Sequence, residues 1–133
     1  MKLVVHVDGG SRGNPGPAAA GAVLRTPAGE VVAEASRTIG RATNNVAEYQ
    51  ALLLGLERAR ELGATEVDVI NDSELIAKQV TGRYKVKHAD MKPLHAEARE
   101  ALDRFERWSI RSVPRAENAE ADALVNAALD AAR

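Results

Sequence analysis

The chain contains no cysteine, and this absence excludes several kinds of chemistry at once. Disulfide bonds, thiol catalysis and cysteine-bound zinc or iron–sulfur clusters are ruled out. The three histidines, His6, His88 and His95, are scattered and show no zinc-ligand spacing. A metal ion would therefore be held by oxygen ligands, which favours Mg²⁺ or Mn²⁺.

Aromatic residues are also scarce, and the chain has no net positive charge. The few aromatic residues are too dispersed for a base-stacking platform that binds single strands; they are Tyr49, Tyr84, Phe105 and Trp108. The formal net charge of −1 argues against a protein that binds nucleic acid through overall positive charge. A local basic face is still compatible with this net charge, because acidic residues gathered at another site would offset its positive charge in the sum.

The 133 residues include no apolar stretch of membrane length and no charged-then-apolar leader. We therefore expect a cytoplasmic protein that does not bind membranes. A composition with 45% hydrophobic and 28% charged residues is typical of a soluble globular chain. We expect a single domain over residues 1–133 and a monomer, and fusion to a larger protein stays an open alternative.

Apolar periodicity and turn residues predict a mixed α/β protein. Apolar runs at 3–7, 18–25 and 30–38 predict a three-stranded antiparallel meander, and we expect the Gly- and Pro-rich stretch 8–17 to be irregular. Further strands are predicted at 67–71 and 108–113, and helices at about 45–62, 73–80, 93–105 and 118–132. The predicted fold class is α/β, with a five-stranded mixed sheet of meander plus parallel strands, flanked by helices.

Four carboxylates stand at the ends of these predicted elements: Asp8, Glu48, Asp72 and Asp122. Asp8 and Asp72 follow strands, Glu48 falls in the first turn of the long helix, and Asp122 lies one turn into the last helix. A right-handed crossover makes the fourth strand parallel to the first, so the four side chains meet if these strands are neighbours. Close carboxylates repel one another, and two divalent cations would resolve this and form a phosphodiester-cleaving site.

Each of these acids also has a purely structural interpretation when it is taken alone. Asp8 could form a turn before two glycines, and Asp72 could cap the following helix. Glu48 fits a capping-box-like pattern with Asn45, and Asp122 could be a solvated acid near a helix start. Together these interpretations require four coincidences in one order, so we favour the metal site.

Four segments of the chain resemble the ribonuclease H type 1 family: 7–16 (VDGGSRGNPG), 42–48 (ATNNVAE), 71–73 (NDS) and 117–124 (ENAEADAL). Each motif alone is modest, but all four in this order are specific, and the resemblance covers nearly the whole chain. It implies endonucleolytic hydrolysis of the RNA strand of RNA–DNA hybrids, leaving 5′-phosphate and 3′-hydroxyl ends. The cofactor that it implies is Mg²⁺ or Mn²⁺, with two ions per site.

The resemblance also implies roles for individual residues. The catalytic, metal-binding carboxylates would be Asp8, Glu48, Asp72 and Asp122. The implied substrate-binding residues are Gly10, Ser11, Arg12, Asn14, Thr43, Asn44, Asn45, Lys85, Lys87 and Arg115. The asparagines would read 2′-hydroxyls and base edges in the minor groove, which suits a side chain with both donors and an acceptor. Thr43 would help to hold a phosphate of the DNA strand.

Two departures from the family pattern matter. Many members carry a histidine in a mobile loop before the last Asp, but segment 112–117 has none. Arg115, Glu117 or solvent then takes that role, or the role is missing. The basic strip 83–92 is short for the family, so we expect weaker substrate binding and unchanged chemistry. Two alternatives stay open: a non-cleaving module that binds hybrids or helps assembly, and a nuclease for double-stranded RNA or DNA junctions.

Overall fold

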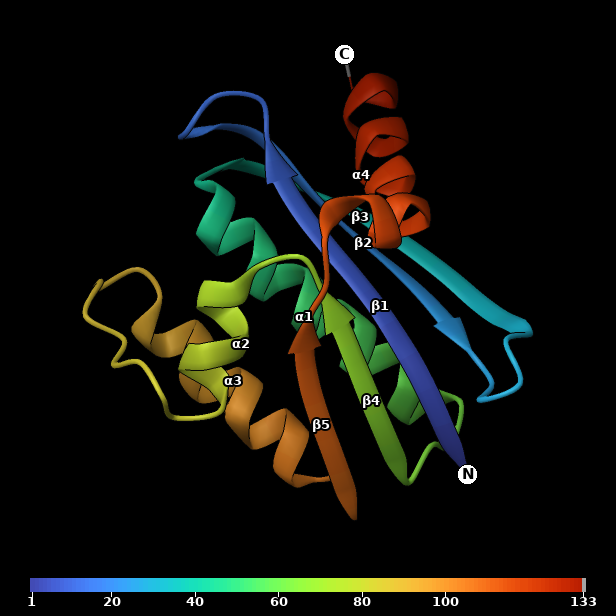
Figure 1. Cartoon of the computed structure of the whole chain (residues 1–133). Coiled ribbons are helices and arrows are strands. Elements are labelled where there is room, and N and C mark those ends of the chain that lie inside the picture. The colour runs from blue at the N-terminus through green and yellow to red at the C-terminus, as the bar shows by residue number, and fades with distance from the viewer. Residues whose placement is uncertain (133) are drawn as a thin grey trace.

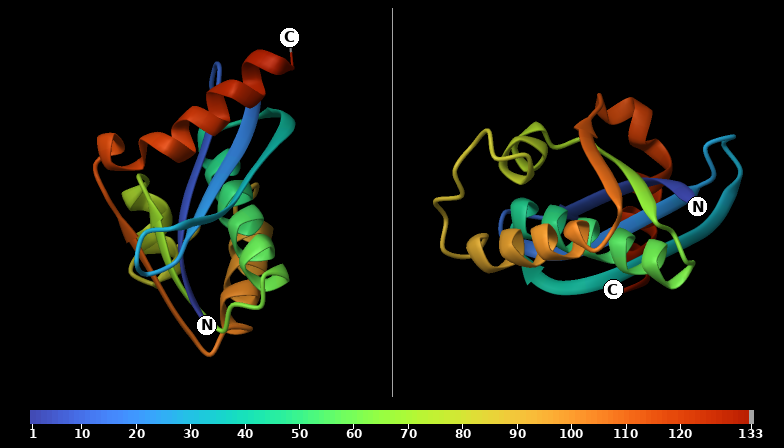
Figure 2. Two further views of the ribbon diagram at one scale, coloured as in Figure 1. Left: turned by 90° about the vertical axis from the view of Figure 1, so that its right-hand side faces the viewer. Right: turned by 90° about the horizontal axis from the view of Figure 1, so that it is seen from below.

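The computed structural model describes residues 1–132, which form a mixed sheet with helices on both faces (Figure 1; Figure 2). In chain order the elements are β1 (Lys2–Ser11), β2 (Gly16–Arg25), β3 (Val31–Ala42), α1 (Asn44–Glu61), β4 (Glu66–Asn71), α2 (Glu74–Val80), α3 (Lys92–Asp103), β5 (Arg107–Ser112), the short 3₁₀ helix η1 (Arg115–Asn118) and α4 (Ala119–Ala131). The predicted fold class is confirmed.

The five strands lie in the order β3-β2-β1-β4-β5, with β1 at the centre. The meander β1-β2-β3 is antiparallel, whereas β1, β4 and β5 run parallel. His6 of β1 pairs with Ile70 of β4, so Asp8 and Asp72 follow at matching positions, two residues further along neighbouring strands. The predicted convergence of the carboxylates required the first and fourth strands to be neighbours, and β1 and β4 are neighbours in the sheet.

The main hydrophobic core lies between the sheet and α1, with α3 packed beside α1 on the same face. Gly55 in the middle of α1 allows this close approach, because a Cβ atom there would lie 2.7 Å from methyl groups of both Val5 and Val7. The opposite face is covered by α4, which packs across β2, β1 and β3 (Figure 2). Within residues 1–132, no helix is long and apolar enough to cross a membrane.

The expectation that residues 8–17 are irregular was wrong at both ends of that stretch, since β2 already begins at Gly16. β1 continues to Ser11, and Gly9 and Ser11 pair with Ala20 and Ala18 of β2. Glycine at position 9 serves helix packing instead of a turn, since a Cβ atom there would lie 2.1 Å from the carbonyl oxygen of Ala47 in α1. Asp8 therefore lies inside a strand, and the turn-forming interpretation of this residue is also wrong.

Candidate active site

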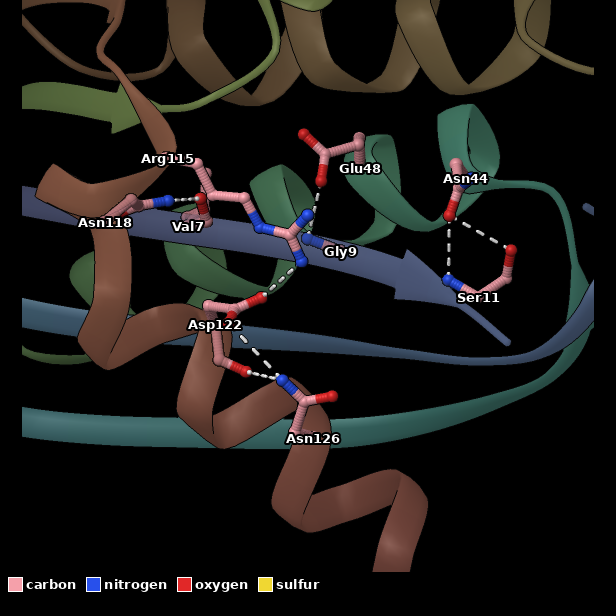
Figure 3. Close-up of polar contacts among 9 residues, drawn as sticks. All are labelled: Val7, Gly9, Ser11, Asn44, Glu48, Arg115, Asn118, Asp122 and Asn126. Atoms are coloured by element: carbon pink, nitrogen blue, oxygen red, sulfur yellow. Dashed lines mark hydrogen bonds and ion pairs between the residues drawn. The ribbon is translucent and has the colours of Figure 1, made fainter. Parts of the chain in front are cut away.

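All four predicted carboxylates line one pocket of about 450 Å³ at the end of β1 and β4. Carboxylate oxygens of Asp8, Glu48 and Asp72 lie within 4.8 Å of one another. Asp122 approaches from the first turn of α4, on the other side of β1 from Glu48 (Figure 3). Four elements far apart in the sequence thus bring four acids to one place.

Asp8 is the most central of the four acids and is only 5% exposed. Burial is the main cause that raises its pKa to about 9, and the neighbouring charges of Glu48 and Asp72 contribute to this rise. A contact with Asp122 adds to this effect. The three other acids therefore all act on Asp8, and its charged form is unfavourable without a nearby cation.

Glu48 faces the pocket because its side chain bonds to β1 and not to its own helix. The N-cap of α1 is Thr43, whose hydroxyl accepts a hydrogen bond from the Val46 amide at 3.2 Å. Glu48 lies two residues further into the helix than a cap at Asn45 would place it, and its Oε1 accepts the Gly9 amide at 2.7 Å (Figure 3). The capping interpretation is therefore wrong. Burial raises the pKa of Glu48 to about 7, although the Gly9 hydrogen bond works against this rise.

Asp72 follows β4 directly. Its side chain faces the pocket, because the side chains of Asn71 and Ser73 accept the nearby backbone amides instead. Ser73 is the N-cap of α2, and its hydroxyl accepts the Ile76 amide at 3.2 Å. The Asn71 side chain accepts the Ser73 amide at 2.6 Å. The interpretation of Asp72 as the helix cap is therefore wrong.

Asp122 is held by side chains from η1 and from α4 itself (Figure 3). Its Oδ1 accepts a hydrogen bond from Nη2 of Arg115 at 3.3 Å, and its Oδ2 accepts one from Nδ2 of Asn126 at 3.3 Å. Sequence reasoning missed Asn126, although a polar residue four positions after Asp122 on one helix face is a usable signal. The Arg115 side chain is 78% exposed and projects over the acidic pocket, which it also lines.

Asn118 joins the start of α4 to β1 beside the carboxylates. It is 2% exposed, and its Nδ2 donates to the carbonyl oxygen of Val7 at 2.8 Å (Figure 3). Val7 directly precedes Asp8, and Asn118 is four residues before Asp122. One buried hydrogen bond therefore fixes the spacing between the strand that carries Asp8 and the helix that carries Asp122. Sequence reasoning noted Asn118 as the start of a helix and as part of segment 117–124, but gave it no partner on β1.

The residues expected to contact substrate lie mostly around the carboxylates. The main pocket is lined by six of them: Gly10, Ser11, Arg12, Asn44, Asn45 and Arg115. An adjoining pocket of about 210 Å³ is lined by Asn14, Thr43 and Asn45, together with His88. Lys85 and Lys87 lie on the exposed connection between α2 and α3, and line neither pocket.

Hydrogen bonds join the β1–β2 hairpin to the start of α1. The Ser11 amide donates to Oδ1 of Asn44 at 2.9 Å (Figure 3). The Asn44 amide donates to Oδ1 of Asn14 at 3.0 Å. Within residues 1–132, no protein acceptor takes up the Nδ2 groups of Asn14 and Asn44. These donors are exposed at the rim of the pocket, where a ligand can reach them.

The donor set of the pocket fits a hard divalent cation. Its potential ligand atoms are carboxylate oxygens, three of them already within 4.8 Å of one another. Two of the acids are buried, and burial raises the pKa of both Asp8 and Glu48, so their ionised forms call for a compensating charge. Oxygen ligands in this number are typical of Mg²⁺ or Mn²⁺ sites.

Comparison with known proteins assigns the chain to a family. The family model described as reverse transcriptase-like matches residues 6–128. Ribonuclease HI of Halobacterium salinarum is 51% identical over 129 residues, 97% of this chain and 65% of that protein. Ribonuclease H of Cereibacter sphaeroides is 34% identical in an alignment that covers 96% of this chain and 94% of that protein. The chain belongs to the ribonuclease H family. The predicted family is thereby confirmed.

Solved ribonuclease H structures match the fold closely. The type 1 enzyme of Halobacterium salinarum superimposes with a TM-score of 0.96 at 49% identity, covering 98% of both chains. A type 1 ribonuclease H isolated from compost, solved in complex with an RNA/DNA hybrid, gives a TM-score of 0.94 at 42% identity and also covers 98% of both chains.

Some ribonuclease H relatives are much longer than this chain. A Mycobacterium tuberculosis protein named as bifunctional is 53% identical over 133 residues, which make up 99% of this chain but 36% of that protein. Its N-terminal ribonuclease H domain has been solved, with a TM-score of 0.96 to this structure. The chain thus spans about a third of the mycobacterial protein, and 65% of the halobacterial ribonuclease HI.

Proposed function

We propose that the chain is a metal-dependent endoribonuclease that hydrolyses the RNA strand of RNA–DNA hybrids and leaves 5′-phosphate and 3′-hydroxyl ends. The observation that supports this most strongly is the convergence of Asp8, Glu48, Asp72 and Asp122 from four separate elements into one pocket. A module that only binds a nucleic acid has no use for this arrangement, because gathered carboxylates repel both one another and phosphate.

The four carboxylates would hold two divalent ions, Mg²⁺ or Mn²⁺. When bound, such ions activate a water for in-line attack on phosphorus and stabilise the departing 3′-oxygen. Asp8 would be a central ligand of this site, since Glu48, Asp72 and Asp122 all act on it. Asp72 would add a ligand on the Glu48 side of the metal site, and Asp122 would add one on the α4 side. The Gly9 amide keeps the Glu48 carboxylate directed at this centre.

The rim of the pocket would recognise the hybrid through its minor groove. Asn14 and Asn44 each use the side-chain oxygen within the protein, which leaves the Nδ2 donors for 2′-hydroxyls or base acceptors. A 2′-hydroxyl is the group that distinguishes RNA from DNA. Gly10, Ser11, Arg12 and Asn45 would complete this surface, and Thr43 would face a phosphate of the DNA strand. Lys85 and Lys87 would add only long-range attraction, because they lie outside both pockets.

Arg115 would occupy the place of the loop histidine that many members carry. Arg115 lines the carboxylate pocket and contacts Asp122, whereas Glu117 lines a separate cavity beside His6. A guanidinium stays charged at all accessible pH values, so it cannot accept a proton. We therefore assign Arg115 the task of binding phosphate oxygens beside Asp122, and proton transfer would fall to solvent.

The proposed domain spans the whole chain, residues 1–133, as a ribonuclease H domain that acts as a monomer. The solved mycobacterial ribonuclease H domain is the N-terminal part of a longer protein, so such a domain also occurs joined to other domains. A fused protein would place further partners beside this domain without changing its carboxylate pocket. The size of the pure chain in solution, measured by light scattering, tests the monomer.

The deciding experiment is cleavage of a hybrid labelled at one end of its RNA strand, with Mg²⁺, Mn²⁺ or EDTA. RNA–RNA and DNA–DNA duplexes of the same sequence and the Asp8→Asn variant are run beside it. We expect metal-dependent cutting of the hybrid RNA alone, and none by the variant. Equal or better cutting of the RNA–RNA duplex would change the substrate assignment. Hybrid binding without cutting would favour the non-cleaving module.

A further inference from the structure

Arg115 projects over the carboxylate pocket from η1, whose backbone is tied to two neighbouring strands. On one side of η1, the Val113 amide donates to the carbonyl oxygen of Asn71 in β4 at 2.8 Å. At the other end, the buried side chain of Asn118 donates to the carbonyl oxygen of Val7 in β1. The backbone of Arg115 is therefore held between β1 and β4, whereas its side chain is mostly exposed and has room to turn.

The guanidinium of Arg115 contacts one carboxylate of the pocket and acts on the other three. Its Nη2 donates to Oδ1 of Asp122 at 3.3 Å, and in Figure 3 the group lies over β1 between Glu48 and Asp122. This hydrogen bond is the main cause that raises the pKa of Arg115, and the charges of Asp8 and Asp72 act in the same direction. Burial raises the pKa of Glu48, and the charge of Arg115 is among the causes that lower it. Arg115 thus supplies positive charge to all four acids in the metal-free protein.

The other arginine that lines the pocket, Arg12, has its charge paired elsewhere. Arg12 forms a 2.7 Å ion pair with Asp130, near the end of α4. Within residues 1–132, the acid that forms an ion pair with Arg115 is Asp122 alone. The position of the Arg115 side chain is therefore set by the carboxylates of the site.

A metal ion at Asp122 would have to compete with this guanidinium. Both oxygens of Asp122 already accept hydrogen bonds, Oδ1 from Arg115 and Oδ2 from Asn126. Asn126 is neutral and tolerates a nearby cation, but a divalent ion and a guanidinium on the same carboxylate repel each other. On the β1 side, by contrast, the donor to Glu48 is the neutral amide of Gly9. The competition therefore concerns the α4 side of the pocket.

We propose that Arg115 is a built-in counter-cation, which holds Asp122 in the metal-free protein and leaves it when a phosphate of the hybrid binds. The inference rests on the proposed function and concerns the order in which the pocket fills. Phosphate oxygens offer a guanidinium a planar, charged acceptor as good as a carboxylate. Each phosphate contact that draws Arg115 away frees Asp122 for a metal ion, so hybrid and ion favour each other's binding.

The first test is a calorimetric titration with Mn²⁺ in the absence of nucleic acid. A second binding step that is weak or missing in wild type should appear in Arg115→Ala, or strengthen by about 5-fold or more. Arg115→Lys keeps the charge and should resemble wild type more closely. Arg111→Ala is the matched control, because Arg111 is an exposed arginine near Arg115 that does not line the carboxylate pocket. Equal titration curves for Arg115→Ala and wild type, or an equal gain in Arg111→Ala, would overturn the inference.

The second test compares melting temperatures at about pH 8 in EDTA and in saturating Mn²⁺. In EDTA, Arg115→Ala should melt slightly below wild type, because the acids lose their counter-cation. In Mn²⁺ this difference should disappear or reverse, since the ion then supplies the charge. Arg111→Ala should show no difference that depends on metal. A deficit of Arg115→Ala that is the same in EDTA and in Mn²⁺ would mean that the contact is only structural.

The third test asks whether the hybrid draws Arg115 away from Asp122. In wild type, the Mn²⁺ concentration for half-maximal single-turnover cleavage of saturating hybrid should lie below the dissociation constant of the weaker step without hybrid. In Arg115→Ala the gap between these two values should be smaller. An equal gap in both proteins would overturn the coupling.

These measurements separate failure of the counter-cation from failure of the proposed function. Wild-type protein that binds no Mn²⁺ and cuts no hybrid would overturn both. Wild-type protein that binds Mn²⁺ and cuts the hybrid, with an Arg115→Ala variant that binds Mn²⁺ as wild type does, would overturn the counter-cation alone.

Discussion

The two sides of the carboxylate pocket are built differently. On the β1 side, Asp8 and Glu48 are buried, and the Gly9 amide fixes the Glu48 carboxylate. On the α4 side, the Asp122 side chain is 28% exposed and is held by Arg115 and Asn126, both exposed. Burial makes the ionised carboxylates of the β1 side unfavourable without a cation. On the α4 side, solvent and the Arg115 guanidinium already stabilise the ionised carboxylate of Asp122. We therefore expect the first side to dominate metal binding, and the second to adjust to substrate.

The largest effect should come from the centre of the buried side. Asp8→Asn removes the buried central carboxylate of the proposed metal site, and we expect a loss of at least about 10³-fold in cleavage rate. Gel-resolved cleavage of a hybrid measures the loss, and circular dichroism checks that the fold persists. Asp122→Asn is the comparison variant. If it lost as much cleavage rate as Asp8→Asn at the same metal concentration, and more metal did not restore the rate, the proposed difference between the two sides would be contradicted.

The buried side should also make metal-free stability depend on pH. The folded-state pKa is about 9 for Asp8 and about 7 for Glu48, against about 4 for both in an unfolded chain. An acid whose pKa is raised on folding stabilises the fold below its unfolded pKa, and this contribution is lost as the pH rises through the folded pKa. In EDTA the melting temperature should therefore fall between about pH 5 and about pH 9.

Metal binding and Asp8→Asn should each remove this loss of stability. Added Mn²⁺ should raise the melting temperature more at about pH 8 than at about pH 5, because the ionised acids bind it. Asp8→Asn should raise the metal-free melting temperature at about pH 8, and Asp122→Asn should change it little. Calorimetric scans of the three proteins measure both effects. A metal-free melting temperature that rises with pH over this range would contradict the assignment.

A smaller effect is expected from the exposed side. Arg115→Ala removes a partner of Asp122 and a phosphate ligand, and we expect cleavage to slow by about 10- to 100-fold. Arg115→Lys should recover part of the rate, because it keeps the charge but loses the planar fork. Single-turnover kinetics measure the rates. Glu117→Gln is the control, and a larger loss in that variant than in Arg115→Ala would transfer the role to Glu117.

The smallest effect is expected from the connection between α2 and α3. Lys85→Ala and Lys87→Ala should each weaken hybrid binding by only a few-fold and leave the single-turnover rate at saturation unchanged. Each should lower the salt slope by less than the value of about one expected for a full phosphate contact. Titrations at several salt concentrations measure both quantities. A fall in the salt slope of about one in either variant would show that the short basic strip contacts the hybrid directly.

The sequence was sufficient to predict the elements, their order and the four carboxylates. Apolar periodicity and the turn residues are local, so they located the helices and strands to within a few residues of their observed ends. The meeting of Asp8 with Asp72 needed one further condition, that β4 lies beside β1, which the sheet order supplies. No residue within either strand specifies that neighbour, so the prediction had to stay conditional.

What could not be predicted depends on contacts between distant segments. Gly9 looked like part of a turn, and only the approach of Ala47 shows why a side chain is excluded there. Glu48 fitted a helix cap, and only the position of β1 shows that it accepts the Gly9 amide. Asn118 reaches Val7 across 111 positions, and no local pattern encodes such a partner.

The hydrogen bonds that join Ser11, Asn14 and Asn44 have a consequence for the kinetics of binding. They connect the hairpin and the start of α1 into a single unit before any ligand arrives. A duplex that meets this surface does not have to order a loop, so little conformational entropy is lost on encounter. Association should then proceed at a rate set by diffusion and electrostatic attraction, without a slow rearrangement, and differences in affinity among duplexes should appear as differences in residence time.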